Sequence, residues 1–134
     1  MPHDENRDPN QWYGEYYANR DLNGTPVLKR IEGTGALDRN WGGGGIGYGI
    51  PSDNFSARWT RTVNLASGQY RFHVRHDDGA KLFIDDALTL DLWNNCCGEN
   101  TVDVSVTQGD HTLRLEWYDS GGDAYAGLTW DALT

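Results

Sequence analysis

The chain has 134 residues, which is the length of a single domain. Its content of 37% hydrophobic and 12% aromatic residues excludes a disordered chain, and no stretch approaches the roughly 20 apolar residues of a membrane span. The 20 acidic and 11 basic residues give a net charge of −9 without a visible basic face, which argues against nucleic acid and membrane insertion. Residues 1–11 are polar and are expected to form a disordered lead-in, so that a single domain spans residues 12–134.

Alternating apolar and polar residues predict a succession of β-strands. Two early stretches, Trp12 to Tyr17 and Val27 to Ile31, are expected to be edge strands. The alternation then continues at residues 55–63, 70–74, 82–84, 88–92, 102–106, 113–117 and 126–130. Asp85-Asp86 stands where a two-residue hairpin turn belongs, since Asp tolerates positive φ. No window has a helical period, so we predict an all-β, two-sheet antiparallel β-sandwich.

Three long loops interrupt the predicted strands, at residues 40–52, 94–100 and 119–125. Long loops on a small sandwich are where function is usually carried. Their aromatic residues are candidates for stacking on the apolar faces of sugars: Trp41, Tyr48, Trp93 and Tyr125. By alternation, Trp59 and Trp117 should lie in the core instead.

The segment His76-Asp77-Asp78-Gly79 is the sharpest chemical signal. Calcium takes six to eight oxygen ligands, and adjacent carboxylates can supply several of them. Neighbouring strand residues normally point to opposite faces, so both carboxylates reach one ion only where the backbone turns, for example at a cis peptide. The alternative interpretation is a simple Asp-Asp-Gly turn. The second acidic loop, from Asp119 to Asp123, offers further ligands or is only a hairpin loop.

The only two cysteines are adjacent, Cys96 and Cys97. They can close a vicinal disulfide, although their Cα separation lies below the usual disulfide range. Such a disulfide would form a rigid apolar knob and one wall of a sugar pocket. The alternatives are two free thiols or an intermolecular bridge.

Catalytic signals are weak. The sequence contains no G-x-S-x-G or H-E-x-x-H motif, and its four histidines have no metal-binding spacing. We therefore expect a binding module and not an enzyme.

The order of these motifs resembles the PA14 (PA-fourteen) domain, a family first named from the anthrax protective antigen. The resemblance runs from about Trp12 to Asp131. Asp77 to Asp85 resembles the hallmark D-D-G-x-x-L-x-I-D-G, with Asp86 in place of the final Gly. The other similar segments are Trp12 to Tyr17, Asp53 to Thr60 (D-x-F-S-V-R-W-T), Ser67 to Phe72, Gly109 to Tyr118 and Gly127 to Trp130.

The resemblance implies a β-sandwich and, in lectin-type members, a calcium site. In those members the first two Asp of the D-D-G motif are joined by a cis peptide and bind calcium, which in turn binds vicinal sugar hydroxyls. Carried over, the expected metal ligands are Asp77, Asp78, Asp119, Gly121 and Asp123. The expected sugar contacts are Asp77, Asp78, Trp93, Asn95, Cys96, Cys97 and Asp123. The Cys96-Cys97 pair is not part of the general family pattern.

We therefore expect a calcium-dependent carbohydrate-binding module. It would be a monomer within a larger secreted enzyme or adhesin, outside the cell or at its surface. The alternative function is a non-catalytic structural or protein-interaction domain that binds no sugar.

Overall fold

The structure, a computed structural model, describes residues 9–35, 37–42, 50, 54–94, 97–120 and 124–133. These residues form ten β-strands and no helix, so none of them belongs to a helix that could span a membrane. The strands are β1 (Tyr13–Tyr17), β2 (Leu28–Ile31), β3 (Leu37–Gly42), β4 (Phe55–Leu65), β5 (Gly68–Asp77), β6 (Gly79–Ile84), β7 (Ala87–Asp91), β8 (Gly98–Val106), β9 (Gly109–Asp119) and β10 (Ala124–Leu133).

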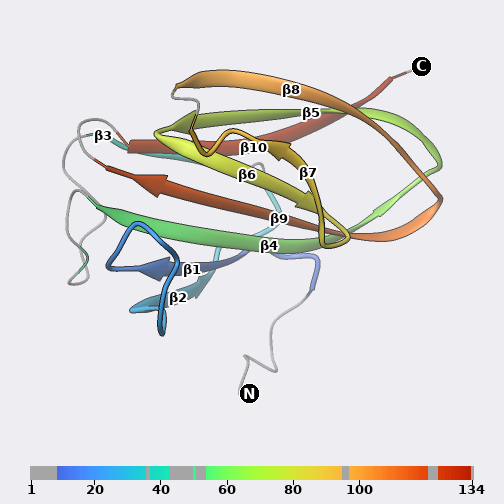
Figure 1. The fold of residues 1–134 in the computed structure, drawn as a ribbon. Coiled ribbons are helices and arrows are strands. Elements are labelled where there is room, and N and C mark those ends of the chain that lie inside the picture. Colours follow the sequence, from blue (N-terminus) through green and yellow to red (C-terminus); the bar gives the residue numbers. More distant parts are fainter. Residues whose placement is uncertain are drawn as a thin grey trace.

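The strands form two antiparallel sheets that stack as a sandwich (Figure 1). One sheet has the order β2-β1-β4-β9-β6-β7, and the other has the order β3-β10-β5-β8. Consecutive strands β5 and β6 lie in different sheets, so the chain crosses between the layers at Asp78. The predicted all-β, two-sheet antiparallel sandwich is confirmed.

The predicted elements differ from the structure at two places. β2 is an edge strand as predicted, but β1 lies between β2 and β4 and is therefore not an edge. β3 falls partly within the stretch assigned to a Gly-rich loop, of which residues 43–49 lie outside the described residues. Its alternation is hidden because Arg39 stands between Leu37 and Trp41, on the same side of the strand.

Aromatic rings from both sheets fill the centre of the sandwich. Trp59 and Trp117 are completely buried, as predicted, with ring centroids 5.9 Å apart. Trp41, expected in a loop, instead packs into this cluster, 5.4 Å from Trp117 and 5.9 Å from Phe55. Tyr16 meets Trp59 edge to face at 5.9 Å. Such rings bury large apolar areas and prefer offset or edge-to-face contacts, so this cluster holds the two sheets together.

A buried carboxylate sits beside this core. The Glu32 side chain is only 2% exposed and accepts hydrogen bonds from the hydroxyl of Tyr16 and the guanidinium of Arg39. Trp59 Nε1 lies 3.3 Å from Glu32 and Arg30 Nε lies 3.4 Å from it. Burial, together with the charge of Glu32, raises the pKa of the Tyr16 hydroxyl far above its usual range. Arg39 thus interrupts the apolar pattern of β3 because it neutralises a charge buried between elements.

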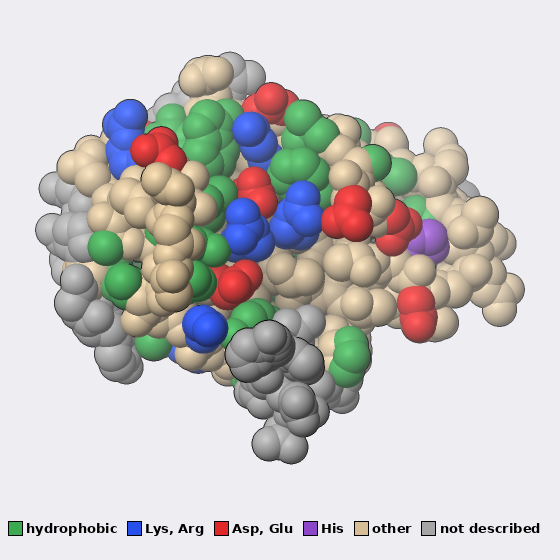
Figure 2. All heavy atoms as spheres, turned by 60° about the horizontal axis from the view of Figure 1, so that its bottom comes forward, with side chains coloured by type: hydrophobic (Ala, Val, Ile, Leu, Met, Phe, Trp, Pro, Cys, Tyr) green, Lys and Arg blue, Asp and Glu red, His purple; other side chains and the backbone are tan. Residues whose placement is uncertain are grey.

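Acidic and basic side chains are interspersed on the face that bears β1, β2 and β4 (Figure 2). On the outer side of the same sheet, Arg58 and Glu116 pair at 2.9 Å across β4 and β9. The positive charges on this face therefore stand among carboxylates and do not form the continuous basic surface that a phosphate backbone requires.

The predicted Asp85-Asp86 turn is present between β6 and β7, with φ of 52° and 66° at its two residues. The Asp85 carboxylate accepts hydrogen bonds from the backbone N–H of Thr112 at 2.9 Å and from His111 Nδ1 at 2.6 Å. His111 Nε2 donates to the carbonyl of Thr107 at 2.7 Å. The bond to Asp85, followed by the bond to Thr107, raises the pKa of His111, because both ring nitrogens face acceptors.

We predict that Glu32→Gln lowers the free energy of unfolding by about 3 kcal/mol, because it leaves Arg39 without its buried counter-charge. Urea unfolding measures the loss. Glu99→Gln is the matched control, since Glu99 is 53% exposed and its pair with His73 lies at the surface. Equal effects of the two substitutions would contradict a structural role for the buried charge.

We also predict that the His111–Asp85 pair stabilises the fold mainly in its charged form. A raised pKa contributes stability that is fully present below the unfolded value of about 6.5 and is lost as the pH rises through the folded value. His111→Gln should therefore lower Tm by a few degrees at about pH 6 and by clearly less at about pH 8.5. A Tm difference that is the same at both pH values would refute this coupling.

Candidate functional site

The Asp77-Asp78 pair lies where β5 ends and β6 begins, at one end of the sandwich. The peptide bond between the two residues is cis, as the resemblance implied. The core and the adjacent strand hold this corner through its backbone. Trp117 Nε1 donates to the carbonyl of Asp77 at 3.0 Å, and the N–H of Asp78 donates to the carbonyl of Tyr118 at 3.1 Å. The corner is thus fixed by the buried strand β9.

His76 supports the same corner and was not predicted from the sequence. It is completely buried, and its Nδ1 donates to the carbonyl of Asp78 at 2.8 Å, because a carbonyl can only accept. Its Nε2 lies 2.9 Å from the side-chain amide of Asn100. His76 continues the inward-facing series of Phe72 and Val74 on β5, so an inward histidine at the end of an apolar series was the available signal.

The two carboxylates form one group of metal-ligating atoms with Cys97. A carboxylate oxygen of Asp77, one of Asp78 and the Cys97 sulfur lie within 4.8 Å of one another, and Cys97 Sγ is 3.3 Å from Asp77 Oδ1. No Lys or Arg within the described part of the chain forms an ion pair with Asp78, so no basic side chain there neutralises its carboxylate. Carboxylate oxygens suit hard cations such as calcium, whereas sulfur suits softer metals. The donor set therefore fits calcium through the two Asp, with Cys97 beside the site and not as a ligand.

The second loop reaches the site through Ser120. The Ser120 N–H and hydroxyl donate to Asp78 Oδ2 at 2.6 and 2.9 Å, which orients that carboxylate. Asp119, predicted as a ligand, is completely buried and lies outside the group of Asp77, Asp78 and Cys97. The remaining predicted residues of the metal and sugar sites lie outside the described residues: Gly121, Asp123, Asn95 and Cys96. The Cys96-Cys97 disulfide accordingly stays a prediction.

Trp93 forms a wall beside Gly79. The Trp93 carbonyl accepts a hydrogen bond from the Tyr118 hydroxyl at 2.8 Å, and the rings of the two residues lie 4.5 Å apart. Lys81 Nζ lies 5.0 Å from the Trp93 ring. Burial, followed by the charge of Asp78, raises the pKa of Tyr118. A Cβ at position 79 would collide with the Trp93 carbonyl and the Tyr118 ring, so only glycine lets this wall approach.

These features define a β-sandwich domain whose acidic corner is built from a D-D-G motif. The chain belongs to the PA14 domain family, which it matches over residues 11–132. The resemblance stated from the sequence is thereby confirmed.

The chain is similar to anti-sigma-I factor RsgI3 of Acetivibrio thermocellus, with 31% identity over 122 residues. That match covers 89% of this chain but only 18% of the relative, so the chain spans less than a fifth of the relative's length. An anti-sigma factor domain-containing protein from Clostridium clariflavum is similar in structure, with a TM-score of 0.80 and 29% identity over 92% of this chain and 42% of that chain. The PA14 sugar-binding domain from an RTX adhesin shares the fold, with a TM-score of 0.60 and 19% identity over 91% and 89% of the two chains.

We predict that Gly79→Ala destabilises the domain by about 1–3 kcal/mol, because the added methyl group overpacks the Trp93 wall. Urea unfolding measures the loss. Gly35→Ala is the control, since a Cβ there has nothing within 4 Å. If Gly79→Ala lowers the free energy of unfolding no more than Gly35→Ala does, close packing against Trp93 does not require glycine at position 79.

Proposed function

We propose that the domain binds carbohydrate through a calcium ion held by Asp77 and Asp78. The observation that carries this proposal is the convergence of the two carboxylates at one corner, with their metal-ligating atoms within 4.8 Å. A calcium ion bound there would take two adjacent sugar hydroxyls as ligands in place of water.

Hydrogen bonds within the chain preorganise this corner for a ligand. Ser120 occupies Oδ2 of Asp78, which leaves Oδ1 for the cation. Trp117 and His76 fix the carbonyls of Asp77 and Asp78 from the buried side. A rigid site loses little conformational entropy on binding, so more of the free energy of its few contacts contributes to affinity.

The sugar contacts are part of the same proposal. Trp93 and Cys97 flank the carboxylates within the described structure, and we propose that Asn95, Cys96 and Asp123 complete the pocket, with Gly121 and Asp123 supplying further oxygens to the ion. The RTX adhesin domain that shares this fold is named as sugar-binding, which supports the same class of ligand. With so few groups engaged, we expect a Kd in the mM to sub-mM range, which repeated copies in a larger protein would strengthen by multivalency.

The role that we propose is binding without turnover, in a larger secreted protein at or outside the cell surface. The buried imidazole of His76 supports this role, because it is committed to the Asp78 carbonyl and the Asn100 amide and does not face a ligand as a general base.

A protein-interaction domain is the second candidate function. It is favoured by one observation: the relatives with about 30% identity are named anti-sigma factors, proteins whose name denotes action on another protein. Under this alternative, calcium neither stabilises the domain nor supports sugar binding.

We predict that millimolar calcium raises Tm by several degrees over a sample in excess EDTA. A ligand present at about 100 times its Kd stabilises the native state by about 2.7 kcal/mol. Asp78→Asn should abolish this rise, because it removes one charge from the ion's ligands while keeping an acceptor for Ser120. Asp86→Asn, an exposed acid paired with Arg114, is the matched control and should keep the full rise.

A glycan array probed with and without calcium then separates the two functions. Calcium-dependent glycan binding that Asp78→Asn eliminates supports the proposal. If calcium does not raise the Tm of the wild-type domain and the domain binds no glycan on the array, the proposal is rejected in favour of the interaction domain.

A further inference from the structure

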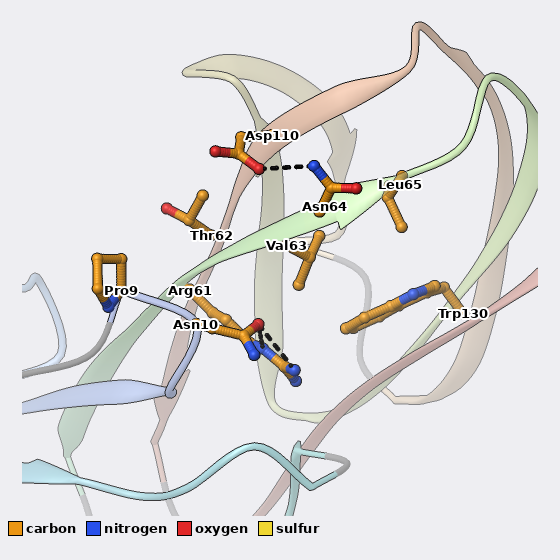
Figure 3. A pocket seen from close by; sticks show the side chains of 9 residues that line it. All are labelled: Pro9, Asn10, Arg61, Thr62, Val63, Asn64, Leu65, Asp110 and Trp130. Carbon is orange, nitrogen blue, oxygen red and sulfur yellow. Dashed lines mark hydrogen bonds between the residues drawn. The ribbon is translucent and has the colours of Figure 1, made fainter.

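A second hollow lies at the end of the sandwich away from Asp77 and Asp78. In the β4–β9 ladder, Phe55 pairs with Asp119 beside the acidic corner, and Leu65 pairs with Gly109 at the other end. At that far end a pocket of about 520 Å³ opens at the rim of the sandwich, around the end of β4 (Figure 3). A second hollow of about 340 Å³ adjoins it, and the two share Arg61 and Trp130. Volumes of this size are typical of small-molecule sites.

Arg61 stands at a position where the alternation of β4 calls for an apolar residue. It has the same parity as the buried residues Trp59, Val63 and Leu65, so it faces the other sheet. Trp130 faces it from β10, in the inward series of Ala126 and Leu128. The two inward residues therefore meet where the layers open.

The guanidinium of Arg61 is held between two indole rings. Its central carbon lies 5.8 Å from the ring centroid of Trp12 and 5.7 Å from that of Trp130. Its Nε and Nη2 both donate to Asn10 Oδ1, at 3.3 and 3.2 Å. These contacts fix the plane of the guanidinium. Its Nη1 makes no hydrogen bond to the described residues, so this nitrogen is available to a ligand.

Arg61 has no counter-charge among the described carboxylates. The arginines that do pair with a described carboxylate are Arg30, Arg39, Arg58, Arg71, Arg75 and Arg114. Burial lowers the pKa of Arg61, in keeping with a charge that has lost water without gaining a partner. A carboxylate is the group that would complete this site, because its two oxygens match the guanidinium fork.

The rest of the pocket suits a compact ring. In Figure 3 the side chains of Arg61, Val63 and Trp130 lie on one side of β4, whereas those of Asn64 and Asp110 lie on its other side, as the alternation of the strand requires. Asn64 Nδ2 donates to Asp110 at 2.9 Å, and this exposed pair belongs to the outer rim of the hollow. A ring held at Arg61 would lie against the indole of Trp130 and the side chain of Val63.

We propose that this pocket binds a small carboxylate built on a six-membered ring, with the carboxylate on Arg61 and the ring against Trp130. The ring comes from one of two sources, a sugar acid or an aromatic acid. The net charge of −9 disfavours anions over the whole molecule, so binding of a carboxylate depends on its specific contact with Arg61. The site needs no metal and is independent of the proposed calcium site.

The test is a nitrogen–proton NMR titration of the whole chain in excess EDTA, which removes calcium. The probes are D-glucuronate and benzoate, with methyl glucoside and benzamide as their neutral counterparts. We expect one of the two acids to shift the Trp130 indole and Arg61 Nε signals with a Kd on the order of mM, and its neutral counterpart to bind at least about tenfold more weakly. The acid that binds identifies the source of the ring.

Arg61→Gln should weaken binding of that acid at least about tenfold, whereas Arg71→Gln should not change it. Arg71 is the matched control because it is exposed and pairs with Asp103 on the other sheet. The proposal is overturned if neither acid binds at about 50 mM, if acid and neutral counterpart bind equally, or if Arg61→Gln binds like the wild type. Should Arg61→Gln fail to fold, the comparison of acid with neutral counterpart on the wild-type chain still decides.

Discussion

One indole connects the core of this domain to its acidic corner. Trp117 is completely buried among the aromatic rings that join the two sheets, and its single N–H donates to the carbonyl of Asp77. Because a buried indole N–H needs an acceptor, the same residue packs the core and locates the chain at the point where it crosses between layers. The carboxylates of Asp77 and Asp78 are therefore placed by the packing of the sandwich, and Ser120 orients only that of Asp78.

The strands that could be predicted were those with an uninterrupted run of inward apolar residues, such as β5, β6 and β9. β3 was missed because Arg39 breaks its pattern, and the reason for that arginine, the buried Glu32, lies on a different segment. Likewise, the sequence suggests that β1 is an edge, because strand order depends on long-range pairing with β2 and β4. Local patterns predict where strands are, and contacts between distant segments decide how they are arranged.

The candidate site was predictable where the family motif is contiguous, at Asp77 and Asp78. His76 and Ser120 were not predicted, although both lie within two residues of a predicted ligand. Their roles depend on which way a side chain or a backbone N–H points after the chain turns, and neighbouring residues in the sequence do not specify this. The Arg61–Trp130 pair was harder still, since the two residues come from different sheets and meet only when the sandwich closes.

The course of the chain also decides what each end of the sandwich can present to its surroundings. The backbone N–H of Thr62 donates to the carbonyl of Pro9, and Leu133 pairs with Gln69 at the start of β5. The described part of the chain therefore begins and ends at the end of the sandwich that bears the Arg61 pocket. Asp77 lies at the opposite end of β5 from Gln69. Within a longer polypeptide, segments attached at that end would lie away from the acidic corner, which would face outward. The Arg61 pocket would instead face those flanking segments, with Pro9 already part of its wall.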